Sequence, residues 1–157
     1  GVGNADLLGT AFTVAGNIQS TVTTSSTISG TFAINNKGSR STSVNGQSVK
    51  VKFYISSNDA IGSSDYLAFE KIIPATGIAS GATFTDTYSF TLPKLSASNS
   101  TTPTKWDIYW DTLTASKTGS FTAYVGMVIE FVDDADSANN SNVGLGKDKG
   151  EATVVPK

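Results

Sequence analysis

The sequence predicts an all-β fold, a two-sheet antiparallel β-sandwich of about eight or nine strands. Three observations predict it. Apolar residues alternate with polar ones in several short stretches, which is the period of a strand with one buried face. Ser and Thr together number 42 of 157 residues and Gly adds 15, a composition that suits strands joined by polar turns. Long runs of Ala, Leu, Glu and Lys are few, so a helical bundle is not expected.

Four stretches show the alternation most clearly. In residues 27–35 the apolar side chains share one face, with Gly30 between them. The longest stretch, residues 121–132, is apolar on both faces, so we expect a central strand that is buried on both sides. The residues expected to face inward are Ile28, Phe32 and Ile34; Val49, Val51, Phe53 and Ile55; Phe84, Tyr88, Phe90 and Leu92; and Phe121, Ala123, Val125, Met127, Ile129 and Phe131, with Tyr124, Val128 and Val132 opposite the last set.

Turn and loop residues separate these stretches. Residues 35–38 and the pair Asn45-Gly46 tolerate left-handed backbone, and residues 74–81 and 93–103 are predicted loops. No loop is long enough to divide the chain, so residues 1–157 are expected to form one domain. The sequence begins with Gly1 rather than Met, which indicates a processed mature chain or an excised module.

Composition excludes several classes of function. The chain has no Cys and no His, so disulfides, thiolate chemistry and imidazole-based catalysis or metal binding have no residues to carry them. Its net charge is −2, and its few Lys residues are scattered, whereas nucleic-acid binding needs a clustered basic face. No apolar stretch approaches the roughly 18 residues of a membrane span. Neither nucleic acid nor membrane insertion is therefore expected.

Three segments, in order, resemble the CARDB family, the cell adhesion related domain found in bacteria. The first is residues 31–38, a strand ending in an Asn-x-Gly-type turn. The second is residues 51–59, followed by Asp65 and by residues 79–83 and 90–93. The third is residues 131–140, a closing strand with an acidic turn and an Asn-Asn pair. The resemblance covers roughly residues 27–143.

Two features depart from the family pattern. The acidic turn lacks the Glu residues that usually precede the Asn pair, and an insertion at about residues 94–117 brings the segment Lys105-Trp-Asp-Ile-Tyr-Trp-Asp111. The resemblance implies an immunoglobulin-like sandwich in exported, often multidomain proteins, where such domains are spacers, adhesion modules or accessories beside enzymes. A fold of this kind does not by itself specify a ligand.

Two acidic loops are candidate calcium sites, because Ca²⁺ prefers six to eight oxygen ligands. No cofactor is required on other grounds, so Ca²⁺ is the one candidate ion. The loop of residues 133–140 is not an EF-hand, and the alternative is a solvated turn in which Asn139 and Asn140 bond to the local backbone. The first loop contributes Asp133, Asp134, Asp136, Asn139 and Asn140, and the second contributes Asn58, Asp59 and Asp65.

Trp106 and Trp110 fall on the same side of a strand predicted for residues 105–111. Four residues of strand place the two indoles roughly 13 Å apart. If exposed, they and Tyr109 would form an aromatic carbohydrate-binding surface on which sugar rings stack. If buried, they would belong to the core, because large aromatic side chains dominate burial energetics. The second alternative is favoured.

No enzymatic activity is expected. A glycosidase needs two carboxylates at a defined separation, and the pairs available, Asp107 with Asp111 and Glu70 with Glu130, carry no sequence signal for distinct acid and base roles.

The leading hypothesis is a non-catalytic structural or adhesion module, secreted or on the surface of a prokaryotic cell. Its partners would be other copies of itself or neighbouring domains of a surface protein. One version is a fibre subunit that assembles by strand addition, with residues 7–15 and 151–155 as candidate strands. The alternative is a carbohydrate-binding module of a secreted polysaccharide-degrading enzyme, with polysaccharide as its partner.

Overall fold

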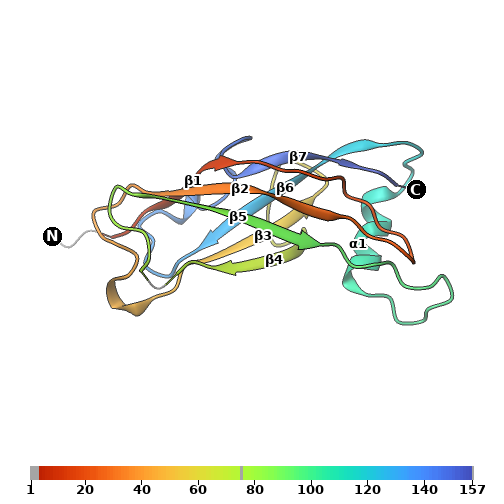
Figure 1. The fold of residues 1–157 in the computed structure, drawn as a ribbon, viewed down its shortest axis with the longest axis horizontal. Helices are drawn as coiled ribbons and strands as arrows, with labels where there is room; N and C mark the ends of the chain where they lie inside the picture. The colour runs from red at the N-terminus through yellow and green to blue at the C-terminus, as the bar shows by residue number, and fades with distance from the viewer. Residues whose placement is uncertain (1–3, 75, 157) are drawn as a thin grey trace.

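The chain forms seven strands in residues 4–74 and 76–156, the residues that the computed structural model describes, and four of them are the alternating stretches of the sequence. Three strands form one antiparallel sheet in the order β1-β2-β5, and four form the other in the order β4-β3-β6-β7. This confirms the predicted all-β sandwich of two antiparallel sheets (Figure 1), with fewer strands than the eight or nine expected. The strands are β1 (Leu7–Phe12), β2 (Thr27–Asn36), β3 (Lys50–Ser56), β4 (Tyr66–Ile72), β5 (Thr83–Thr91), β6 (Phe121–Glu130) and β7 (Lys149–Val154).

The sheet to which β4 belongs determines which edge strands of the two sheets face each other. β4 pairs with β3, whereas in a constant-type immunoglobulin domain the fourth strand belongs to the sheet of the first two. Consequently β4 and β5 are the edge strands on one side of the sandwich, where Lys71 and Asp86 bridge them. On the other side β1 and β7 are the edge strands, and Phe12 donates a backbone hydrogen bond to Gly146 just before β7.

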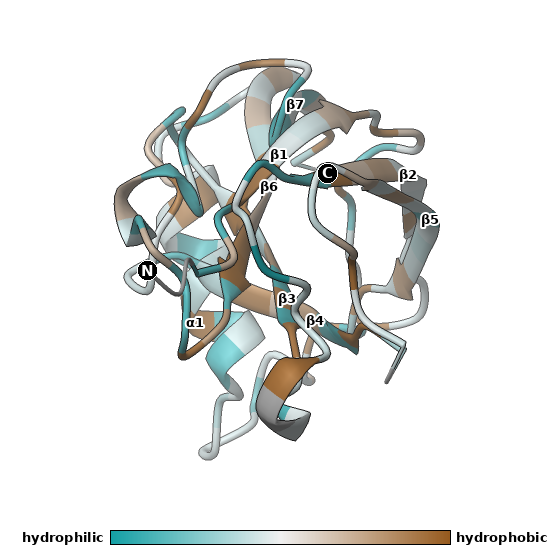
Figure 2. Ribbon diagram, turned by 90° about the vertical axis from the view of Figure 1, so that its left-hand side faces the viewer, coloured by the Kyte–Doolittle hydropathy of each residue, from teal (hydrophilic) through white to brown (hydrophobic). Residues whose placement is uncertain are grey.

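The core between the sheets is rich in aromatic rings. Phe53 of β3 lies with its ring centroid 5.5 Å from Phe32 of β2 and 4.7 Å from Tyr88 of β5. Phe12 of β1 stacks on Tyr88 at 5.2 Å. Figure 2, which looks along the sandwich, shows β2 and β5 on one side of this interior and β3 and β6 on the other. Burying one such side chain is worth about 1.5–3 kcal/mol, so these rings hold the sheets together.

β6 is central, as predicted, because it pairs with β3 on one side and β7 on the other. The prediction that it is buried on both faces is wrong. Its inner residues are buried, but Tyr124 and Val128 on the outer face are half-exposed, and Val132, beyond the end of the strand, is 82% exposed. The reason is that the outer face meets solvent and carries charged pairs such as Lys52–Glu130, at 2.7 Å.

The strand predicted for residues 105–111 is also wrong, because Lys105–Thr114 forms the helix α1. Thr104 and Asp107 make a capping box that starts the helix: the Thr104 hydroxyl accepts from Asp107 N, and the Asp107 carboxylate accepts from Thr104 N. Trp106, Trp110 and Leu113 are buried at helical spacing, whereas Ile108 is 57% exposed. The spacing of Trp106 and Trp110 is compatible with a strand and with a helix. The capping box of Thr104 and Asp107 favours the helix. The part of the chain that the structure describes also has one-turn 3₁₀ helices at Val44–Gly46 and Ser137–Asn139.

Both terminal strands belong to sheets of their own chain. β1 pairs with β2 and β7 pairs with β6, so residues 7–15 and 151–155 complete this sandwich. The strand-addition hypothesis, in which one of these segments is donated to another subunit, is therefore not supported. None of the helices formed by the described residues has the length and apolar character needed to span a membrane.

Candidate functional site

The acidic turn of residues 133–140 holds the N-terminal segment in place. The Asp134 carboxylate accepts from Leu7 N at 3.1 Å and from Asp136 N at 2.9 Å. The Asn140 amide donates to Leu7 O and to Asp134 Oδ2, both at 2.8 Å. Burial raises the pKa of Asp134, against hydrogen bonds that favour its ionised form. The Asp134 carboxylate therefore already accepts hydrogen bonds from the N-terminal segment and from its own turn.

The other members of that turn have separate partners. Asn139 donates to the Asp6 carboxylate at 2.9 Å, and Asp136 accepts from Ala138 N at the start of the 3₁₀ helix. Asp133 is half-buried beside them. Among residues 4–74 and 76–156, no group of three or more acidic side chains is arranged to hold a metal ion. Calcium binding at Asp133, Asp134, Asp136, Asn139 and Asn140 remains a prediction.

The second acidic loop is held by hydrogen bonds and by a lysine. Asn58 accepts from Ala60 N, and Asp65 accepts from Gly62 N, each at 2.9 Å. The buried side chain of Lys149 reaches the loop from β7 and donates to Asp59 O. An ammonium group here does not favour a bound cation, and calcium at this loop too remains a prediction.

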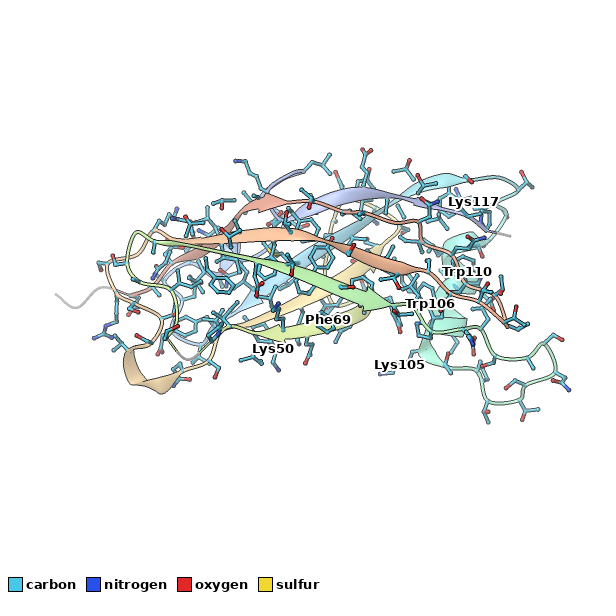
Figure 3. All side chains as sticks on the ribbon, viewed as in Figure 1. Lys50, Phe69, Lys105, Trp106, Trp110 and Lys117 are labelled. Atoms are coloured by element: carbon cyan, nitrogen blue, oxygen red, sulfur yellow. The ribbon has the colours of Figure 1, made fainter. Side chains whose placement is uncertain are left out.

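The tryptophans do not form an exposed platform. Trp106 is 1% and Trp110 5% exposed, and both extend from α1 at one end of the sandwich (Figure 3). Trp106 Nε1 donates to the buried Ser20 Oγ at 3.1 Å. The indoles lie 5.7 Å apart between centroids, far closer than strand spacing implies. The alternative that they are core residues is confirmed, and stacking of a sugar on Trp106 or Trp110 is excluded by their burial.

Tyr109, the third member of that candidate set, lines a groove between α1 and the start of β4. The groove has a volume of about 620 Å³. Its other lining residues include the aromatic Tyr54 and Tyr66, the exposed apolar Leu67 and Ile108, and the polar Asp65 and Lys105. Burial first, and then the Asp65 carboxylate, raise the pKa of Tyr109 to about 12. The groove therefore combines phenol rings with one acidic and one basic side chain.

Three of the four acids considered for catalysis, Asp107, Glu70 and Glu130, have partners of their own. Asp107 accepts from Ser96 N, Ser96 Oγ and Thr104 N, and these bonds lower its pKa to about 2. Glu70 and Glu130 lie on different strands, and the lysines of β3 pair with them: Lys50 with Glu70 at 3.8 Å, and Lys52 with Glu130 at 2.7 Å. A carboxyl group that is ionised to about pH 2 is a poor proton donor at neutral pH.

Sequence reasoning missed two sets of polar contacts. Lys149 and Asn142 fasten the loop before β4, where Asn142 accepts from Ile61 N at 2.7 Å and donates to Ile61 O at 2.8 Å. Lys71 and Asp86 join the free edges of the two sheets at 2.8 Å. The second pair had one sequence signal, because a lysine in a strand is typical of an edge strand. We find no sequence signal for the first.

Comparison with known proteins assigns the chain to no family. No protein-family model matches the chain, and no curated protein matches it. Among solved structures it is similar to beta-glucosidase 3B from Thermotoga neapolitana, at 10% identity and a TM-score of 0.45, and to a beta-glucosidase involved in saponin metabolism from intestinal bacteria, at 14% and 0.47. A third is DesR, a beta-glucosidase from Streptomyces venezuelae, at 19% and 0.37. The matches cover 95–96% of this chain but only 15–16% of those chains. At these values they assign neither family nor function, and the resemblance to CARDB remains a prediction from the residues.

Proposed function

We propose that this chain is a non-catalytic structural module of an extracellular or cell-surface protein, in which it sets the distance between the segments attached to its two ends. The observation that carries the proposal is the position of those ends. The described chain begins at one end of the long axis and finishes at the other (Figure 1).

Hydrogen bonds fix this separation. At one end Asp6 O accepts from Lys37 N, which directly follows β2, at 2.9 Å. At the other end Val155 N donates to Ile18 O at 3.0 Å, close to Gln19, whose carbonyl accepts from Ser26 just before β2. The two ends are thus separated by the length of β2, whose ten residues span roughly 33 Å. A chain that enters and leaves in this way lengthens its host protein.

The polar side chains support a structural role. Asp134, Asn139 and Asn140 bond to the N-terminal segment, and Asp107 caps α1. Most residues that could have bound an ion or moved a proton are therefore engaged in holding the fold. The resemblance of residues 27–143 to CARDB supports an exported setting in a prokaryote, with neighbouring domains or further copies as partners.

A tandem protein tests the proposal. Three full copies, joined from the end of one to the start of the next, should form an extended particle whose maximum dimension increases with each copy. Small-angle X-ray scattering of one, two and three copies measures this dimension directly. The proposal is contradicted if the three-copy protein folds back to a particle little longer than two copies.

The groove beside Tyr109 favours a second candidate function, a carbohydrate-binding module. A concave site with aromatic walls and a few polar groups is the usual form of a small-ligand site. The rings of Tyr66 and Tyr109 would contact the apolar face of a sugar, and Asp65 and Lys105 would bond to its hydroxyl groups. This candidate keeps Tyr109 from the predicted aromatic surface and uses neither indole.

Affinity electrophoresis on gels containing soluble polysaccharides tests the second candidate. Retention of the protein should be lost in Tyr109→Ala and kept in Tyr124→Ala, a matched change on the half-exposed outer face of β6. Equal migration of both variants and the unsubstituted protein on every polysaccharide would remove this candidate.

A further inference from the structure

The first and last segments of the chain run side by side in the same direction. Ala5 is bridged to Asp134 and Ile18 to Val154, both in parallel orientation. Ala135 N donates to Ala5 O at 2.8 Å at one end. We call the set of backbone contacts between residues 5–18 and residues 134–155 the terminal clamp. It closes the side of the sandwich formed by β1 and β7.

Further backbone bonds continue the terminal clamp along the molecule. Phe12 N donates to Gly146 O at 3.0 Å near its middle. At the far end Ile18 is bonded twice, donating to Thr153 O at 2.8 Å and accepting from Val155 N at 3.0 Å. The bonds therefore extend over most of the distance between the two chain ends, and are not confined to one of them.

Two glycines let the segments approach closely. A Cβ added at Gly9 would lie 2.7 Å from the Cβ of Asp148 and 2.8 Å from Lys147 O. A Cβ added at Gly150 would lie 2.8 Å from a methyl group of Val14. At Gly9 the neighbours are a backbone oxygen and a Cβ, so a side chain there would push the two segments apart. At Gly150 the neighbour is a side-chain methyl group, which would have to move to admit one.

Tension applied between the chain ends acts on the terminal clamp in a particular direction. Force pulls residue 5 away from residue 155 along the strands, whereas interstrand hydrogen bonds lie largely across the strands. The two parallel segments can separate only by sliding past one another, which loads the bonds at Ala5, Phe12 and Ile18 together. Strands pulled apart from the same end instead lose their bonds one after another.

We propose that the terminal clamp is a force-bearing element, and that this module keeps its fold when its ends are pulled apart. The inference rests on the proposed function, because a spacer in a surface protein transmits tension. It goes beyond that function in naming the contacts that carry the load. Resistance to forced unfolding depends on the unfolding rate, so it can be changed separately from equilibrium stability.

Single-molecule force spectroscopy on the full chain tests the proposal by changing only the direction of pulling. The sequence contains no Cys, so handles can be attached at introduced cysteines. One form carries Asn4→Cys and Pro156→Cys, at opposite ends of the molecule. The other carries Asn4→Cys and Val132→Cys, where the exposed Val132 lies near the Ala5–Asp134 bridge. The first form should unfold at a severalfold higher force than the second.

A backbone variant identifies the bonds that carry the load. Val155→Pro removes the N–H that donates to Ile18 O, and Val155→Ala, which keeps that N–H, controls for the loss of the valine side chain. Val155→Pro should lower the end-to-end unfolding force below that of Val155→Ala, and leave the force between residues 4 and 132 unchanged. The proposal would be overturned if the otherwise unsubstituted protein unfolded at the same force in both pulling directions. It would also be overturned if Val155→Pro lowered the unfolding force equally in both.

If Val155→Pro does not fold, the comparison of pulling directions in the otherwise unsubstituted chain still decides the matter. The spacer function and the clamp fail in different experiments. A tandem protein that folds back contradicts the spacer whatever the unfolding force, and a low end-to-end force contradicts the clamp even when the tandem protein is extended.

Discussion

Lys71 and Asp86 form an ion pair of 2.8 Å that joins the free edge of one sheet to the free edge of the other. Lys71 Nζ also donates to Thr87 O at 2.8 Å, a backbone carbonyl of the edge strand β5. The Lys71 hydrogen bond, followed by that of Thr87 N, lowers the pKa of Asp86. A charged residue in this position opposes the addition of a further strand, because pairing would desolvate it.

Replacement of Lys71 should therefore promote self-association. We expect Lys71→Met to form dimers and larger species through the β4 and β5 edges, measured by light scattering coupled to size-exclusion chromatography. Lys94→Met, in the exposed loop after β5, makes the same change of charge and should keep the mass of the unsubstituted protein. Identical masses for both variants would show that Lys71 does not protect this edge.

The sequence was sufficient to predict the sandwich but not every element in it. Alternation identified β2, β3, β5 and β6, because each has one face in the core. It failed at Trp106 and Trp110, whose i, i+4 spacing fits a strand as well as a helix, and at Ile108, which a strand would place on their face and the helix places in solvent. The capping residues Thr104 and Asp107 were the better signal. A search for caps before alternation would have predicted α1.

The cap at Asp107 predicts a specific pH dependence. Its pKa, about 2, is lowered by hydrogen bonds from Ser96 and Thr104, below its ordinary value of 3.8. A lowered pKa in the folded state contributes stability that is present above pH 3.8 and is lost as the pH falls toward 2. We expect Asp107→Asn to melt at a lower temperature than the unsubstituted protein at pH 6, and the difference to shrink between pH 3.8 and about 2.

Asp111→Asn is the matched control, because Asp111 lies one turn further along α1 and is exposed. Its melting temperature should follow that of the unsubstituted protein across the same pH range, measured by circular dichroism. A pH-independent difference for Asp107→Asn would show that its carboxylate does not stabilise the cap through its charge.

The candidate sites were harder to predict than the strands, because their partners are remote in sequence. The acidic neighbours of Asp134 predict a calcium ligand, yet its carboxylate accepts a hydrogen bond from Leu7 N, 127 positions away. The sequence around an Asp that accepts backbone hydrogen bonds can look the same as the sequence around an Asp that binds a cation. The hydrogen bond to Leu7 becomes evident only from the topology, which brings the start of β1 to the end of β6.

The hydrogen bond between Trp106 and Ser20 predicts a loss of stability. Ser20→Ala leaves the buried indole N–H without its acceptor, which costs about 1–3 kcal/mol of unfolding free energy. Urea unfolding followed by tryptophan fluorescence measures it. Ile108→Ala, an exposed change on the same helix, should stay within about 0.5 kcal/mol. Equal midpoints for the two variants would mean that the indole N–H finds another partner.

Gly30 lies where residues 13–15 run antiparallel alongside β2. A Cβ added there would overlap Thr13 O, the carbonyl that accepts from the Tyr88 hydroxyl at 2.7 Å, and would also approach the Tyr88 ring at 2.9 Å. The contact is with backbone, so it cannot be relieved by a side-chain rotation. Overpacking of this kind costs typically about 1–3 kcal/mol, and the displaced Thr13 carbonyl would weaken its bond to Tyr88 as well.

Gly30→Ala should accordingly be among the most destabilising single substitutions in the chain. Gly119→Ala, in the loop before β6, has open space around the added methyl group and should change the unfolding free energy by no more than about 0.5 kcal/mol. Chemical denaturation of the two variants under the same conditions compares them directly. If Gly30→Ala is as stable as Gly119→Ala, residues 13 and 30 do not approach as closely as the structure places them, and the aromatic core around Tyr88 is packed differently.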